Sequence, residues 1–511
     1  MFDVVIRGGF VVDGTGAPAF RADVGVNGDQ IAAIGRLTPD DSGQTEIDAT
    51  GRYLFPGFID THVHADAAVF DPAMQLAALR QGVTTLLLGQ DGLSFAPAGP
   101  ATIEFVTRYF APVNGPHPEL TDQGVEVADL LASYDRRVPL NTAYLLPHGT
   151  IRHHVMGTAE RAPSEDELGA MRRSVERGLE DGAAGLSTGL EYAPGRYAAA
   201  PELAALCIPV ASAGLPYVTH MRGYEANAAN GLAEVVEIAR QANVAAHVSH
   251  YHGPPELLTG QIDKGTDLTF DSYPYTRGST TLAMVTLPGW LPAADFDAAL
   301  DALADPAITG QLDAPWERIT LSHVPDDGLR WTEGLRFTDA ARQAGQEPAA
   351  FCREVLLATG LEAGCVFGFP SENHEAEGSM RTLIRHPAHM TGSDGIYRGG
   401  HPHPRGWGAF ARLLGHHVRE VGDWTWEQAS VHLAGHPARR FRLTDRGLLR
   451  KGYKADIVVV DPTTVAARAT YESPRELALG VEHVIVNGVQ ALSGGALTPG
   501  GRGAGRVLRP G

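Results

Sequence analysis

The pattern of hydrophobic and polar residues changes twice along this chain. Near both ends, short runs that alternate apolar and polar residues stop at glycine or asparagine, for example over residues 2–7 and 481–488. This pattern predicts β-strands joined by turns, and Asn27-Gly28-Asp29 is typical of a hairpin. We expect residues 1–55 and 441–511 to form one small β-sandwich domain built from both termini.

The middle of the chain, residues 56–440, alternates apolar runs with amphipathic stretches. That alternation is typical of βα units around a parallel sheet. Eight such units predict a TIM-type (β/α)8 barrel, an α/β fold whose active site lies at the carboxyl ends of the strands. The expected strands lie at residues 58–63, 83–88, 140–146, 183–187, 216–220, 244–250, 267–271 and 389–392.

The spacing between the seventh and eighth expected strands is too long for a single helix. We therefore expect an insertion at about residues 285–380. Long excursions between barrel elements often cover a site or line its pocket.

The composition narrows the class of protein. The chain has 511 residues, 43% of them hydrophobic, which is enough for a large core plus an accessory domain. Its net charge of −19 argues against nucleic acid or an anionic membrane as a partner. Three cysteines, Cys207, Cys352 and Cys365, predict no disulfide framework, and the N-terminus lacks a signal-peptide pattern, so we expect a cytoplasmic protein. No apolar run approaches the length of a membrane span.

The candidate chemistry begins at the end of the first barrel strand. Residues two apart in a strand point to the same face, so His62 and His64 in Asp60-Thr61-His62-Val63-His64 are expected to lie side by side. Neutral histidine is a common nitrogen ligand of zinc. This pair therefore predicts part of a metal site.

Three more polar side chains are expected at the same rim. His220 ends the fifth expected strand and His250 ends the sixth, 30 residues later, which is one βα repeat. Asp394 follows the eighth strand. Because parallel strands bring their carboxyl ends to one edge, we expect these residues to converge with His62 and His64 on a metal centre.

These motifs resemble the amidohydrolase superfamily, which carries His-x-His on strand one, single histidines on strands five and six, and aspartate on strand eight. Within it, the chain resembles the D-aminoacylase (N-acyl-D-amino-acid deacylase) family over nearly its whole length. The resemblance implies hydrolysis of N-acyl-D-amino acids, small molecules with a free carboxylate, to a carboxylate and a D-amino acid. It is carried by GFIDTHVH at 57–64, QGVTT at 81–85, GLSTGL at 185–190, YAPG at 192–195, VTHMR at 218–222, DSYPY at 271–275, GSDG at 392–395 and HPHPR at 401–405.

The resemblance also implies a zinc centre of one or two ions. In that arrangement His62 and His64 hold one ion, and His220 and His250 hold a second. Zinc lowers the pKa of bound water to about 7, so a nucleophile is available at neutral pH. Asp394 is expected to bind metal, to take the proton of that water and to pass it to the leaving amine.

The third ligand departs from the family pattern. The family usually has cysteine in an Asn-Cys-Gly turn after strand two, but this chain has Gln90-Asp91-Gly92. Other branches of the superfamily bridge two metals with a carboxylated lysine on strand four, and none of Lys264, Lys451 and Lys454 lies there. Asp91 is the favoured replacement, because a carboxylate also binds zinc. Glu191, which follows strand four, is the alternative.

Four residues are expected to contact substrate. Arg405 matches the carboxylate-binding arginine of the family, and the planar fork of guanidinium donors suits a carboxylate. The resemblance implies that Tyr275 assists Arg405 and that Tyr192 also lies at the substrate. His252 stands where the family often has a lysine that contacts the carboxylate.

Other interpretations differ in what they require. A dipeptidase for C-terminal D-residues needs an anionic group near the metals to hold a free amine. Cyclic amide hydrolases of the superfamily usually rely on the strand-four lysine that is missing here. A non-catalytic scaffold would have lost ligands, whereas all four histidines and Asp394 are present. A metal-dependent deacylase is therefore the leading hypothesis.

Overall fold

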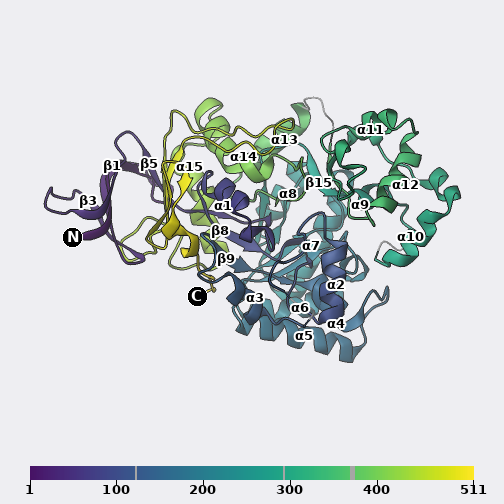
Figure 1. Ribbon diagram of the computed structural model, residues 1–511. Helices are drawn as coiled ribbons and strands as arrows, with labels where there is room; N and C mark the ends of the chain where they lie inside the picture. The colour runs from purple at the N-terminus through teal and green to yellow at the C-terminus, as the bar shows by residue number, and fades with distance from the viewer. Residues whose placement is uncertain (121–122, 292–293, 369–373) are drawn as a thin grey trace.

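The computed structural model describes residues 1–120, 123–291, 294–368 and 374–511. Strands from the two termini lie together at one side of the molecule, and the helices α10 (Phe296–Ala304), α11 (Phe337–Gln343) and α12 (Pro348–Ala358) lie at the opposite side (Figure 1). The parallel strands and their covering helices lie between these two parts.

The terminal strands form one nine-stranded sheet in the order β23-β22-β21-β20-β5-β1-β2-β3, with β4 beside β1. The expected hairpin is confirmed, because β2 and β3 pair antiparallel up to Asn27 and Gln30. The two ends of the chain meet where β5 pairs antiparallel with β20. The strands are β1 (Phe2–Val11), β2 (Phe20–Asn27), β3 (Gln30–Gly35), β4 (Gly43–Asp48), β5 (Tyr53–Pro56), β20 (Ile457–Val460), β21 (Val481–Val486), β22 (Val489–Ser493) and β23 (Ala496–Leu497).

These strands enclose an apolar cluster of their own. Alternate residues of several strands face it, as the period of two in a strand requires. Examples from the N-terminal strands are Val24 and Ile31, and examples from the C-terminal strands are Ile457 and Ile485. Burial of residues from both termini in one cluster ties the two ends of the chain together.

Apart from residues 278–367, the strands in the middle of the chain pair in parallel. They form three groups, β6-β8-β9, β10-β11-β12-β13-β14-β18 and β7-β19. Their bounds are β6 (Phe58–Asp60), β7 (Val63–His64), β8 (Val83–Leu88), β9 (Asn141–Tyr144), β10 (Leu146–Pro147), β11 (Leu186–Gly189), β12 (Tyr217–His220), β13 (Ala246–Val248), β14 (Leu268–Ser272), β18 (His389–Thr391) and β19 (Gly395–Ile396).

Two of the expected strands are interrupted. The first divides into β6 and β7 at Thr61 and His62. At this break the Thr61 N–H donates to the carbonyl oxygen of Thr391 at 3.1 Å, and the Asp394 N–H donates to the carbonyl oxygen of His62 at 2.7 Å. The third divides into β9 and β10 at Leu145, whose N–H donates to the Leu88 carbonyl at 3.0 Å. These bonds connect strands of separate groups, so the first and eighth expected strands lie side by side.

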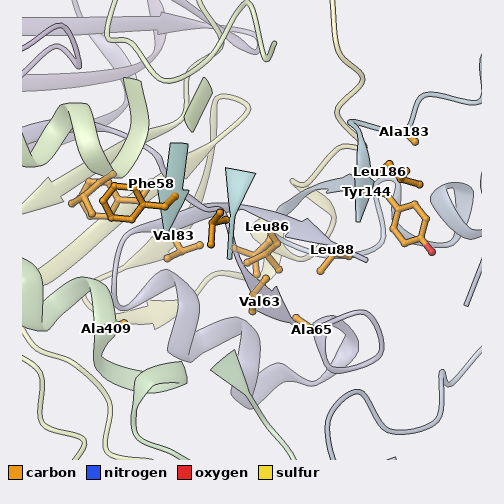
Figure 2. Packing of buried hydrophobic residues seen from close by; sticks show 14 of the residues in the cluster. Phe58, Val63, Ala65, Val83, Leu86, Leu88, Tyr144, Ala183, Leu186 and Ala409 are labelled. Carbon is orange, nitrogen blue, oxygen red and sulfur yellow. The ribbon is translucent and has the colours of Figure 1, made fainter. Parts of the chain in front are cut away.

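Helices cover the parallel strands through a continuous apolar cluster, part of which is shown in Figure 2. Phe58 of β6 stacks on Phe410 of α14, with ring centroids 6.1 Å apart. Truncating a buried phenylalanine of this kind typically costs about 3–5 kcal/mol of stability. The main covering helices are α1 (Pro72–Leu79), α2 (Pro100–Tyr109), α4 (His148–Met156), α5 (Glu165–Glu180), α6 (Ala200–Ser212), α7 (Ala228–Ala242), α8 (Pro255–Asp263), α13 (His374–Ile384) and α14 (Arg405–Arg412).

Local sequence explains where several helices begin and end. Ser164 accepts a hydrogen bond from the Glu167 N–H, and the Glu167 side chain accepts one from the Ser164 N–H, which is a capping box at the start of α5. Asn243 ends α7 in the left-handed conformation that commonly terminates a helix. No helix within the described ranges is long and apolar enough to cross a membrane.

Between β14 and β18 the chain forms a separate antiparallel sheet in the order β15-β17-β16. This sheet consists of β15 (Gly278–Thr281), β16 (Ile319–His323) and β17 (Gly364–Phe367). It shares an apolar cluster with α10, α11 and α12 that includes Leu303, Phe337 and Phe351. The excursion therefore has a core of its own beside the parallel strands.

Candidate metal centre

Six predicted site residues come together at the carboxyl ends of the parallel strands. His62 and His64 come from the interrupted first strand, and His220 is the last residue of β12. Asp91 lies in the turn η2 (Gln90–Gly92) after β8, His250 follows β13, and Asp394 follows β18. All six side chains are buried.

Asp91 contacts all four histidines. Its Oδ1 lies 3.4 Å from the Nε2 of His62. Its Oδ2 lies 3.6 Å from the Nε2 of His64, 3.4 Å from the Nδ1 of His220 and 3.3 Å from the Nε2 of His250. The carboxylate therefore occupies the centre of the cluster.

The atoms that could ligate a metal form two groups, one on either side of Asp91. In one, the Asp394 Oδ1 lies 3.7 Å from His62 Nε2 and 3.3 Å from His64 Nε2. In the other, His220 Nδ1 lies 3.0 Å from His250 Nε2. Ligands of a tetrahedral zinc ion with bonds of about 2.0–2.1 Å are separated by roughly 3.3 Å, which matches both groups.

Several of these candidate ligand atoms have no hydrogen-bond partner among the described residues. They include both ring nitrogens of His62 and the Oδ1 of Asp91. A buried polar atom without a partner costs free energy, so such atoms normally have a ligand, a water molecule or an ion. His62 and His64 with Asp394, and His62 and His250 with Asp91, are each spaced to hold a metal ion.

The backbone at three of the six residues lies in the left-handed region. The φ angles are 41° at Asp91, 34° at His250 and 50° at Asp394. Residues other than glycine seldom adopt this conformation, and it is often found at functional sites. Here it turns the three side chains toward one point.

The charges around the two carboxylates favour their ionised forms. Burial acts to raise the pKa of Asp91, but the neighbouring His62, His250 and His220 outweigh burial and hold that pKa well below its usual range. Burial opposes ionisation at Asp394 as well, and the Arg405 guanidinium and His64 hold its pKa below its usual range. Both groups can therefore act as anionic ligands at neutral pH.

Asp271, at the end of β14, supports two of the histidines. Its Oδ1 accepts a hydrogen bond from the His250 N–H at 2.9 Å, and its Oδ2 lies 2.9 Å from His247 Nε2 and 3.6 Å from His62 Nδ1. A Cβ added at Gly392 would lie 2.5 Å from the His62 Cβ, so only glycine fits there. Neither Asp271 nor His247 was predicted from the sequence to take part in the site, although both lie on parallel strands whose carboxyl ends reach this rim.

Asp60 joins the first and eighth strands. Its carboxylate accepts hydrogen bonds from the Ser393 N–H at 2.8 Å and the Ser393 hydroxyl at 2.5 Å. Burial raises the pKa of Asp60 to about 7 in spite of these bonds. Asp66 fixes the turn that carries Asp91 from both sides. It accepts hydrogen bonds from the Gly89 N–H at 3.0 Å and from the Ser94 hydroxyl at 2.5 Å.

Arg405 lies beside the metal cluster and is fully buried. Its Nη1 is 2.9 Å from the Oδ2 of Asp394, and its guanidinium lies 4.5 Å from the centre of the Tyr273 ring. None of its guanidinium nitrogens makes a well-aligned hydrogen bond with a described residue. Because Nη1 is ion-paired with Asp394, the Nε and Nη2 donors are the ones available to an anionic ligand there.

The other predicted substrate contacts take different positions. Tyr273, rather than Tyr275, stacks on Arg405, and the Tyr275 hydroxyl lies at Gly408, within 2.6 Å of where a Cβ would be. The buried ring of Tyr192 lies 4.9 Å from that of His220. His252 is exposed, stacks on Tyr224 with ring centroids 4.5 Å apart, and places its Nδ1 2.7 Å from the His250 carbonyl oxygen.

The two candidates for the ligand that replaces cysteine also lie apart. Asp91 is inside the cluster, whereas Glu191 contacts the outer nitrogen of His220, with Oε2 2.9 Å from Nε2. Lys264 is exposed and lies between α8 and β14, not on β11, as the sequence indicated.

A fold of parallel strands with this arrangement of histidines and aspartates is that of an amidohydrolase, and the chain belongs to the amidohydrolase family, which it matches over residues 45–491. It is 33% identical to a D-aminoacylase from Alcaligenes xylosoxydans xylosoxydans over 99% of this chain and 97% of that protein.

Two solved structures extend the comparison. The N-acyl-D-glutamate deacylase from Bordetella bronchiseptica, solved with zinc and a phosphonate that mimics the tetrahedral intermediate of its reaction, superposes with a TM-score of 0.84 at 32% identity and 99% coverage of both chains. A D-aminoacylase with a binuclear metal centre, described as activated by one metal and attenuated by a second, superposes with a TM-score of 0.82 at 31% identity and full coverage of both chains.

Proposed function

We propose that this protein is a zinc-dependent amidohydrolase that cleaves the amide bond of N-acyl-D-amino acids and releases a carboxylate and a D-amino acid. The observation that carries the proposal is the buried cluster of four histidines and two aspartates, spaced for zinc beside a fully buried arginine. Two relatives matched over nearly their full length, a D-aminoacylase and an N-acyl-D-glutamate deacylase, support the choice of substrate.

The donor atoms suggest how zinc would be held. His62, His64 and Asp394 would hold one ion, and Asp91 with His220 and His250 would hold a second. A zinc ion supplies a Lewis acid for the amide carbonyl and lowers the pKa of water, which is the chemistry that hydrolysis of an unreactive amide requires.

Asp394 is the proposed proton carrier. Its low pKa keeps the carboxylate unprotonated before the reaction, so it can accept a proton from the attacking water. The amine that leaves an amide must be protonated, and Asp394 can return the proton to it. That transfer regenerates the Asp394 carboxylate, and the positive charge of the neighbouring Arg405 favours its ionised form.

Arg405 is the proposed binding group for the α-carboxylate of the substrate. Its position next to Asp394 brings that carboxylate near the bond to be cleaved. The Tyr273 ring keeps the guanidinium in place through a cation–π contact. The buried Tyr192 ring would pack against substrate at the His220 side of the cluster.

We also propose that the parallel strands close into a (β/α)8 barrel at residues 56–440, with an insertion at about residues 285–380. The bonds of Thr61 and Asp394 to the neighbouring strand support closure. Residues 1–55 and 441–511 would form the accessory β-sandwich around their shared apolar cluster.

A substrate panel tests the proposed function. Metal-free protein reconstituted with zinc should hydrolyse N-acetyl-D-amino acids and leave the matching N-acetyl-L-amino acids intact. The released amine can be measured with an amine-reactive dye. Hydrolysis of the L-series at equal rates, or of neither series, would contradict the proposal.

A further inference from the structure

Glu191 contacts the metal cluster from outside. It is the second residue after β11, is half-buried, and places its Oε2 2.9 Å from the Nε2 of His220. The opposite ring nitrogen, Nδ1, faces inward, 3.0 Å from His250 Nε2 and 3.4 Å from Asp91 Oδ2. His220 therefore lies between the carboxylate of Glu191 and the proposed metal position.

This geometry separates the role of Glu191 from that of Asp91. The two nitrogens of an imidazole point in different directions, so an ion bound at Nδ1 of His220 lies away from a carboxylate bound at Nε2. Asp91 reaches all four histidines, whereas Glu191 is hydrogen-bonded, among the described residues, to His220 alone. The carboxylate of Glu191 thus interacts with a ligand rather than with the ion.

We propose that Glu191 is a positioning residue that selects the tautomer of His220 required for metal binding. A neutral imidazole has one nitrogen that donates a hydrogen and one that offers a lone pair. A carboxylate acceptor at Nε2 places the hydrogen there and leaves the lone pair on Nδ1, directed at Asp91 and His250.

The close approach of His220 and His250 makes this selection necessary. Two nitrogens 3.0 Å apart are compatible only if one of them donates a hydrogen to the other or if an ion lies against both lone pairs. Without Glu191, His220 would carry its hydrogen on Nδ1 and donate it to the lone pair of His250. A hydrogen in that position blocks the metal ion from Nδ1. Glu191 offers the hydrogen a better acceptor on the outer side of the ring.

The inference rests on the metal centre of the proposed function, and metal affinity tests it without an activity assay. Zinc would be titrated into metal-free wild-type protein and into Glu191→Ala and Glu191→Gln variants, in competition with a chelator. Loss of a ligand-orienting partner typically weakens metal binding about 10- to 100-fold. We expect that loss for Glu191→Ala at one of two binding steps. We expect a smaller loss for Glu191→Gln, whose amide oxygen still accepts the hydrogen.

A matched control and a spectrum complete the test. Glu180→Gln makes the same change of charge on an exposed residue at the end of α5 and should bind zinc like the wild type. Cobalt-loaded protein at saturation should show the wild-type absorption spectrum in both Glu191 variants, because the ligands themselves are unchanged. If Glu191→Ala does not fold, the zinc affinity and the cobalt spectrum of Glu191→Gln are used to test the role of Glu191.

The outcomes separate this inference from the proposed function. If the wild-type protein binds no zinc, the proposed metal centre, and with it the proposed function, is contradicted. Wild-type protein that binds zinc, with Glu191→Ala binding it equally tightly, would overturn only the role of Glu191. An altered cobalt spectrum at saturation would make Glu191 a ligand, and a raised KM at unchanged metal affinity would make it a substrate contact. Either result would also overturn the inference.

Discussion

Asp91 stands in the turn where the family resemblance of the sequence leads us to expect a cysteine. A carboxylate is a harder ligand than the usual thiolate and suits several divalent ions. Asp91→Ala should lower zinc content and turnover together, because the carboxylate contacts all four histidines. Asp91→Cys should retain zinc and at least part of the activity. Full metal content and full turnover in Asp91→Ala would make Asp91 a turn residue only.

Asp394 carries the proton in the proposed reaction, so Asp394→Asn should lower kcat by at least about 100-fold, the usual contribution of a general base. The fold should persist, because asparagine has nearly the same size. Metal content measured on the same sample distinguishes loss of the base from loss of a ligand. Turnover like that of the wild type would exclude Asp394 from the chemistry.

Arg405 should discriminate between substrates by charge. Hydrogen bonds to charged groups contribute about 1.5–3 kcal/mol, so Arg405→Ala should lower kcat/KM for N-acyl-D-amino acids by roughly 10- to 100-fold more than for their carboxamide analogues. Arg405→Lys should recover part of the difference, because it keeps the charge but not the planar fork. Equal loss on both substrate types would indicate that Arg405 only supports Asp394.

At the scale of elements, the contact between β18 and the helical turn η9 (Val431–Gly435) predicts a pH dependence of stability. His432 stacks on Trp424, with ring centroids 4.6 Å apart, and its Nδ1 donates to the His389 carbonyl at 2.9 Å. Burial lowers the pKa of His432 to about 4. Between that value and the unfolded pKa of about 6.5, the unfolded chain binds more protons than the folded chain, so stability falls as pH falls, by up to about 1.4 kcal/mol per pH unit.

His432→Asn isolates this contribution, because asparagine can still donate to the carbonyl but does not titrate. The variant should be less stable than the wild type near pH 7.5, since it loses the ring stacking. Its melting temperature should nevertheless fall less on acidification to about pH 5. Thermal unfolding of both proteins in chelator measures the difference, and equal falls would show that His432 does not titrate in this range.

At the scale of the whole molecule, the metal centre joins segments that lie far apart in the sequence. Its residues lie at or just beyond the carboxyl ends of β6, β7, β8, β12, β13 and β18, so a bound ion would crosslink these strands. We expect the purified protein to contain one or two zinc ions, and a chelator to abolish turnover and lower the melting temperature, because ions that bind only the folded state stabilise it. Added zinc should restore both. Chelator-resistant activity in protein without a stoichiometric divalent ion would contradict the metal mechanism.

Strand spacing and alternation were enough to predict that the four histidines meet at one rim. Parallel βα repeats bring the carboxyl ends of their strands to one edge, so His220 and His250 could be placed together from their spacing. The pair His62 and His64 followed from alternation along a strand, although β6 and β7 are separate strands. The meeting of both termini in one sheet followed from their shared alternating pattern.

The contacts of individual side chains could not be predicted from these patterns. Asp91 reaches all four histidines because its backbone is left-handed, a conformation that no hydrophobic pattern encodes. Tyr273 rather than Tyr275 meets Arg405, and Glu191 lies outside His220, because those contacts depend on how loops from different repeats pack. Periodicity is a local property that places residues on a face or at an edge, whereas contacts between loops are set by backbone angles and packing of the whole chain.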